Sequence, residues 1–140
     1  MLHASGGEVI PEALTTILRD ERVVAGWLQG NGLVEDVQVR AFDAALGAFG
    51  VPRRIAGPAQ LLGLEGSIGT PAGEPATSLR ALLVHQTDRG LETIAGEIAS
   101  ARAIALDVFI TSLDDVAFGR AAPWAAAIRA SDPSEREPRA

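Results

Sequence analysis

Two absences narrow what this chain can do. Its 140 residues include no cysteine, which excludes a disulfide framework, a thiolate metal site and a cysteine nucleophile. No apolar run reaches the roughly 18 residues of a membrane-spanning helix, and the first ten residues lack the basic and apolar segments of a signal peptide. We therefore expect a cytoplasmic protein.

Lysine is also absent, so all twelve basic residues are arginine. In a chain rich in alanine and glycine, this bias is typical of a GC-rich genome. The eighteen acidic residues outnumber the basic ones and give a net charge of −6, with an isoelectric point near 4.8. Because proteins that bind nucleic acid electrostatically normally present a basic domain or stripe, this charge argues against direct nucleic-acid binding.

The residues that are present indicate one globular domain. Apolar residues make up 47% of the chain and the mean hydropathy is +0.18, which is a folded rather than a disordered composition. A chain of this length can bury a substantial core.

The first half of the sequence predicts a helix followed by two strands. Residues 8–20 place their apolar side chains on one helical face, with Pro11 in the first turn, where its missing N–H does no harm. An apolar run at 23–29 predicts a buried strand and includes Trp27, which we expect in the core. Gly30-Asn31-Gly32 then predicts a sharp reversal or a bulge, before an alternating strand ends near residue 41.

The second half predicts further strands joined by short turns. A loop covers residues 44–57, with a short strand near 53–55, and turns are predicted at 69–75 and 87–90. Four strands are predicted at residues 58–68, 77–86, 91–99 and 103–112. The fold class is therefore α+β: a mostly antiparallel sheet of six to eight strands with one N-terminal amphipathic helix.

We divide the chain into four parts. Residues 1–7 form a mobile or edge segment, and residues 8–120 form the domain. Residues 121–130 form a short helical segment, and residues 131–140 form a charged tail that we expect to be disordered.

Five segments, taken in order, resemble the plants-and-prokaryotes-conserved (PPC) domain over roughly residues 8–120. They are Gly7-Glu8, Gly30-Asn31-Gly32, V-x-V-R-A-F-D at 37–43, L-G-L-E-G-S-I at 62–68 and A-L-D-V-F-I-T at 105–111. The resemblance implies a compact α+β domain that forms homotrimers. Plant members carry an additional Arg-Gly-Arg-Pro hook for DNA, which this chain lacks, and bacterial members are often labelled as candidate DNA-binding proteins.

The resemblance also implies a position for a metal site, which this sequence has lost. Many prokaryotic members hold a metal with three histidines on two adjacent strands, and the corresponding residues here are Ser78, Arg80 and Glu97. Because a guanidinium repels a dication and cannot ligate it, we expect no metal and no cofactor. Our hypothesis is that an Arg80–Glu97 ion pair occupies this space.

Other polar residues have simpler interpretations. We expect His3 and His85 at the surface, with His85 and Asp88 taking part in a turn. Asp114-Asp115 is interpreted as a solvated turn. Glu65 lies in an apolar strand, so it is either paired, for example with Arg40, or exposed at a sheet edge.

No catalytic constellation stands out, and three functions stay open. The first is a non-catalytic homo-oligomeric binding or regulatory module, whose association with DNA would be through partners. The alternative is a small-molecule-binding protein or enzyme with an intersubunit pocket around Arg80 and Glu97, and the third is a structural trimer that assembles other subunits. The candidate ligand-binding residues are Ser78, Arg80, Glu97, Glu65 and Arg40.

Overall fold

The computed structural model describes residues 1–113, which form eight strands and one helix. The last part of the expected domain (114–120), the expected segments at 121–130 and 131–140, and the Asp114-Asp115 turn lie outside the described residues. The elements are β1 (Leu2–Ser5), β2 (Val9–Ile10), α1 (Glu12–Asp20), β3 (Gly26–Arg40), β4 (Phe42–Asp43), β5 (Ala48–Phe49), β6 (Arg53–Gly69), β7 (Ala76–Thr87) and β8 (Gly90–Ser112). The expected α+β class with a mostly antiparallel sheet and one short helix is confirmed.

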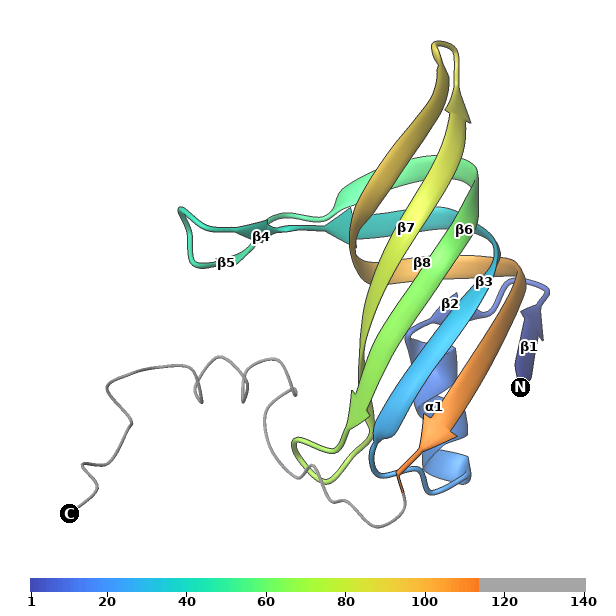
Figure 1. The fold of residues 1–140 in the computed structure, drawn as a ribbon, viewed down its shortest axis with the longest axis vertical. Coiled ribbons are helices and arrows are strands. Elements are labelled where there is room, and N and C mark those ends of the chain that lie inside the picture. Colours follow the sequence, from blue (N-terminus) through green and yellow to red (C-terminus); the bar gives the residue numbers. More distant parts are fainter. Residues whose placement is uncertain (114–140) are drawn as a thin grey trace.

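The four long strands close into a ring. β3 pairs with β6, β6 pairs with β7, and β7 pairs with residues 90–97 of β8, all antiparallel. Residues 97–112 of β8 then pair with β3, which closes the ring (Figure 1). β1 and β2 extend the sheet by pairing with residues 105–108 and 101–102 of β8. The N-terminal segment is therefore an edge strand.

The hydrophobic core fills the inside of this ring. Along β7, the buried Leu79, Ala81 and Leu83 alternate with the exposed Arg80 and Leu82, as a strand with one buried face requires. The helix α1 adds its own buried residues at i, i+4 spacing to the same core; these are Leu14 and Leu18. In the described part of the chain no polar or charged residue is fully buried.

The structure corrects several predicted boundaries. The helix begins at Glu12, because residues 9–10 pair with β8 instead. Gly30-Asn31-Gly32 lies within one continuous strand and is not a reversal; the register with β6 shifts there, with the extra residue on β6. Likewise, β8 runs unbroken for 23 residues through the turn that we expected near 100–102. Leu62 is exposed, because the register between β6 and β7 shifts between Leu61 and Gly63.

Residues 41–52, which we call the arm, contain β4 and β5 and project away from the ring (Figure 1). The sequence predicted only a loop here. The rings of Phe42 and Phe49 meet edge to face, with centroids 5.8 Å apart. At the base of the arm, the backbone N–H of Gly50 donates to the carbonyl of Ala41.

No helix within residues 1–113 is long and apolar enough to cross a bilayer.

Candidate functional site

A row of polar side chains crosses the outer face of the ring. In the strand registers, Gln29 lies opposite Glu65, Glu65 opposite Arg80, Arg80 opposite Glu97, and Glu97 opposite Arg40. Residues directly opposite on adjacent strands share one face of a sheet. We call these five residues the charged row. It places four of the five predicted ligand residues side by side.

Arg40 and Glu97 form the ion pair of this row. Arg40 Nη2 donates to Glu97 Oε1 at 2.5 Å, and the two side chains are 38% and 16% exposed. The guanidinium also lies 5.0 Å from the centroid of the Phe49 ring, within reach of a cation–π interaction. The Nε of Arg40 is buried and has no hydrogen-bond partner among the described residues.

The expected Arg80–Glu97 ion pair is not formed. The two residues are cross-strand neighbours, as predicted, but the Glu97 carboxylate bonds to Arg40 on its other side. Arg80 has no ion pair within residues 1–113. Its guanidinium therefore keeps its hydrogen-bonding capacity free.

Glu65 does not pair with Arg40 either. It is exposed on β6, a strand with partners on both sides, and not at a sheet edge. Solvent on the outer face of the ring hydrates its carboxylate, so the charge needs no buried partner.

A cleft of about 720 Å³ lies where the arm meets the outer face of the ring. All five sequence-predicted ligand residues line it, including Ser78 on β7. The sequence reasoning missed the remaining walls, which are mostly apolar: Ala41, Phe42, Phe49, Gly63, Ala81, Leu82, Ala95 and Gly96. The F-D segment of the V-x-V-R-A-F-D motif was a signal for the arm, but its sequence did not show that it faces β7 and β8.

The fold of this chain is similar to those of several solved structures. A plant- and prokaryote-conserved (PPC) protein from Pyrococcus horikoshii superposes with a TM-score of 0.74 at 16% identity, covering 83% of this chain and 78% of that one. The chain has the PPC-domain fold. No protein-family model matches the sequence, and no curated protein matches it.

Two further PPC-fold neighbours differ in what their names state. A metal-containing protein from Archaeoglobus fulgidus has a TM-score of 0.72 at 20% identity, covering 80% of this chain and 76% of that one. A "putative DNA-binding protein" from Ralstonia eutropha has a TM-score of 0.69 at 15% identity, covering 81% and 76%.

The PPC fold here contains no obvious metal cluster in residues 1–113. No group of three or more His, Cys, Asp or Glu side chains comes together among them. Of the three residues at the position implied by the resemblance, only Glu97 has a side chain that could ligate a cation strongly, and Arg40 already binds it.

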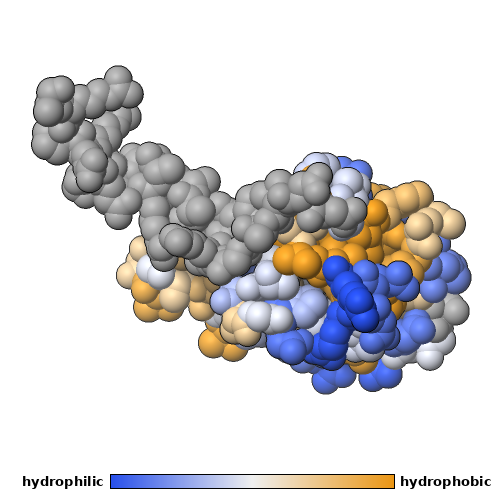
Figure 2. All heavy atoms as spheres, turned by 90° about the horizontal axis from the view of Figure 1, so that it is seen from below, coloured by the Kyte–Doolittle hydropathy of each residue, from blue (hydrophilic) through white to orange (hydrophobic). Residues whose placement is uncertain are grey.

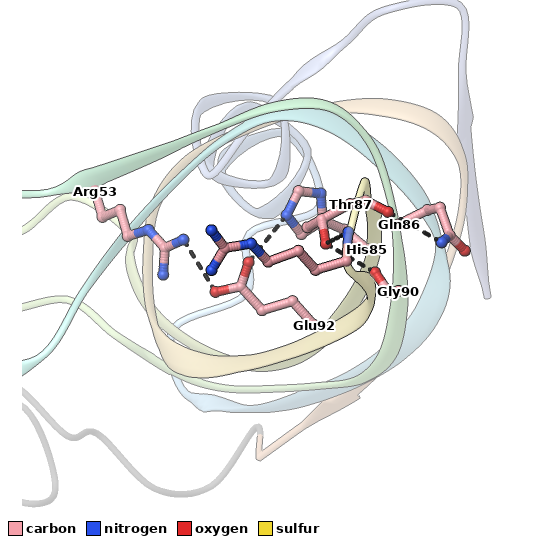
Figure 3. A network of polar contacts seen from close by, with 7 residues as sticks. Arg53, His85, Gln86, Thr87, Gly90 and Glu92 are labelled. Atoms are coloured by element: carbon pink, nitrogen blue, oxygen red, sulfur yellow. Dashed lines mark hydrogen bonds and ion pairs between the residues drawn. The ribbon is translucent and has the colours of Figure 1, made fainter.

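A second polar cluster lies inside one end of the ring (Figure 3). His85 Nε2 is 3.3 Å from Glu92 Oε2, and Arg53 Nη2 donates to Glu92 Oε1 at 3.0 Å. The hydrogen bond from Arg53 lowers the pKa of Glu92, and the charges of Arg53 and His85 act in the same direction. The prediction that His85 is a surface residue is wrong, because its side chain is only 15% exposed and contacts Glu92, not Asp88.

Two other predictions concern the side chains of His3 and Trp27. His3 is exposed as expected, and its Nδ1 lies 2.7 Å from Asp107 Oδ1. Trp27, by contrast, is not a core residue: it is 47% exposed on the outer face of β3. The strand was predicted as buried on both faces, whereas the ring buries only its inner face.

Proposed function

We propose that this PPC-fold chain is a non-catalytic binding module that works as a homo-oligomer and binds a small organic anion in the cleft. The observation that carries the proposal is Arg80, whose guanidinium lines a cleft with apolar walls and has no ion-pair partner among the described residues. A guanidinium stays charged at all physiological pH values and presents donors that fit a carboxylate or phosphate in a bidentate manner.

The surroundings of Arg80 favour an anion with an apolar body. Phe42, Phe49 and Leu82 supply apolar walls, which is the usual composition of a small-molecule pocket with a few placed polar groups. Ser78, two residues before Arg80 on the same strand face, adds a hydroxyl that can donate to the anion.

Among residues 1–113 the cleft shows no paired nucleophile and base. A nucleophilic serine requires an adjacent base, and Ser78 has no hydrogen bond to a histidine or carboxylate within residues 1–113. Glu97 is held by Arg40, which disfavours its use as a general acid. These features support binding over the alternative of an enzyme.

The homo-oligomer is supported by the outer face of the ring. Large apolar side chains are exposed there on β3, β6, β7 and β8; they are Trp27, Leu33, Leu62, Leu82, Ile104 and Phe109. Extended apolar surface on a soluble protein marks an interaction site. The family resemblance makes a trimer the favoured assembly, and any association with DNA is proposed to occur through partners.

Calorimetric titration with phenyl phosphate tests the anion site. We expect the wild type to bind it and to ignore benzyl alcohol, its neutral counterpart. Arg80→Gln should weaken binding by roughly tenfold or more, because a charged hydrogen bond contributes about 1.5–3 kcal/mol. Arg89→Gln, at the β7–β8 turn outside the cleft, is the matched control and should bind as the wild type does.

Two results would overturn the proposal. Equal affinity of the wild type and Arg80→Gln would remove Arg80 from the site. Release of inorganic phosphate from phenyl phosphate, abolished by Arg80→Gln, would contradict the non-catalytic assignment.

A further inference from the structure

We infer that the arm of one copy docks on the outer face of a second copy, along an uncharged row that leads into the cleft. This inference rests on the homo-oligomer proposed above and adds which surfaces meet. The partner is a second copy of this chain. The contact joins two different surfaces, the arm of one copy and the uncharged row of the other.

The arm has the properties of an element that lacks its partner. Its strands contain two residues each, and a two-stranded hairpin alone is at best marginally stable in water. Several of its apolar side chains face solvent, with Phe42 59%, Leu46 71% and Val51 93% exposed. The left side of Figure 2, where the arm projects, accordingly shows mostly hydrophobic colours.

The arm also has almost no charge. Asp43 is the only charged residue in residues 41–52. Its Oδ1 accepts hydrogen bonds from the backbone N–H groups of Ala45 and Leu46 at 2.9 and 3.2 Å. Because its one carboxylate is used within its own turn, the arm fits an uncharged surface better than a charged one.

The outer face of the ring offers such a surface. Thr111 lies opposite Trp27, Trp27 opposite Ser67, and Ser67 opposite Ser78, which makes an uncharged row directly beside the charged row. Phe109, 52% exposed, is a diagonal neighbour of Trp27 and adds apolar area. The row ends at Ser78, which lines the cleft.

The arm does not cover this row in its own chain. It leaves the ring beyond Arg40, at the end of β3, whereas Trp27 lies at the start of the same strand (Figure 1). Docking must therefore join two copies through unlike surfaces. Such a head-to-tail contact closes into a ring of subunits when its rotation permits, and each docked arm then lies beside a neighbour's cleft.

Cysteine cross-linking tests the contact, because the natural chain has no cysteine. The double variant Leu46→Cys/Ser67→Cys joins the arm tip to the uncharged row. Under mild oxidation we expect covalent oligomers up to the size given by light scattering. A mixture of the two single variants should give one covalent pair and no larger species. Leu46→Cys/Thr16→Cys, with the second cysteine on the exposed face of α1, is the matched control and should stay uncross-linked.

The outcomes separate this inference from the proposed function. Wild-type oligomers without a Leu46→Cys/Ser67→Cys cross-link would overturn arm docking and leave the oligomer intact. Efficient dimerisation of Leu46→Cys alone would overturn it too, since arms would then meet arms. A monomer at micromolar concentration would overturn both.

Discussion

Arg40 and Glu97 mark the place where the ring closes, because β8 leaves β7 and joins β3 at Glu97. Glu97→Gln keeps the shape of the side chain but leaves the guanidinium without its counter-charge. We expect it to lower the free energy of unfolding by about 1–2 kcal/mol, a charged hydrogen bond discounted for partial exposure. Urea denaturation would measure this. Glu65→Gln, exposed and unpaired in the described chain, should change stability by under about 0.5 kcal/mol, and an equal loss for both variants would contradict the argument.

Glu92 predicts a pH dependence. Arg53 holds its pKa below the ordinary value, so the ionised carboxylate stabilises the folded state at a pH above the unfolded pKa. That contribution disappears as the pH falls through the folded pKa. We expect Glu92→Gln to be less stable than the wild type at pH 7, and the difference to vanish between about pH 5 and pH 3. Denaturant midpoints across this range are the measurement; a constant difference would show that the charge plays no part.

At the residue scale, sequence reasoning correctly placed Arg80 next to Glu97, but it predicted the wrong ion-pair partner for Glu97. The family resemblance brought Ser78, Arg80 and Glu97 together, and the hairpin turn before Gly90 fixed Arg80 opposite Glu97. The partner of Glu97 depended on its other neighbour, Arg40, which is 57 residues away in sequence. Only the closure of the ring reveals that contact.

At the scale of elements, strand patterning predicted where strands lie but not where they bend. β3 and β8 each bend without breaking, and both bends contain residues that are typical of turns. A single sequence cannot distinguish a reversal from a continuous strand at Gly30-Asn31-Gly32, because glycine's freedom at positive φ suits both. Both halves of β3 pair with the same neighbour, residues 97–112 of β8, which shows that the chain does not reverse there.

Gly32 is a position at which β3 approaches β8 closely. Its φ is +147°, and a Cβ placed there would lie 2.1 Å from the carbonyl oxygen of Ala105. Gly32→Ala should therefore lower stability by about 2–3 kcal/mol, through strain and displacement of β8. Gly63→Ala is the control, since a Cβ at Gly63 meets nothing within 4 Å and its φ is not positive. Thermal unfolding of both variants would show the difference, and similar midpoints would refute the close approach.

At the scale of the whole molecule, the absence of histidines at the positions that the family resemblance implies predicts metal independence. We expect purified protein to contain no stoichiometric zinc, and its melting temperature to be unaffected by a chelator. The double variant Ser78→His/Arg80→His restores two imidazoles on one strand face next to Glu97, a ligand set that suits zinc. Its melting temperature should rise with zinc and fall with chelator. Elemental analysis that finds one metal per natural chain would contradict this prediction.

The charge of the molecule sets its behaviour towards DNA. Arg53 and Arg54 are adjacent and exposed, and repeated around an oligomer they could form a basic cluster. In the structure, however, Arg53 donates to Glu92 and Arg54 to Asp36, so each guanidinium lies beside a carboxylate. Few counterions would be released from DNA on binding, which limits electrostatic affinity. With a net charge of −6, we expect binding to duplex DNA to be weak and lost at about 150 mM salt.

Fluorescence polarisation with a labelled duplex across a salt series tests this prediction on the full chain. Glu92→Gln/Asp36→Asn frees both guanidinium groups and should bind more tightly than the wild type at low salt, with a steeper loss as salt rises. The double variant Arg53→Gln/Arg54→Gln should bind no more tightly than the wild type. Sub-micromolar affinity of the wild type at about 150 mM salt would show that arginines outside these ion pairs form a DNA-binding surface, and that net charge is a poor guide to this molecule.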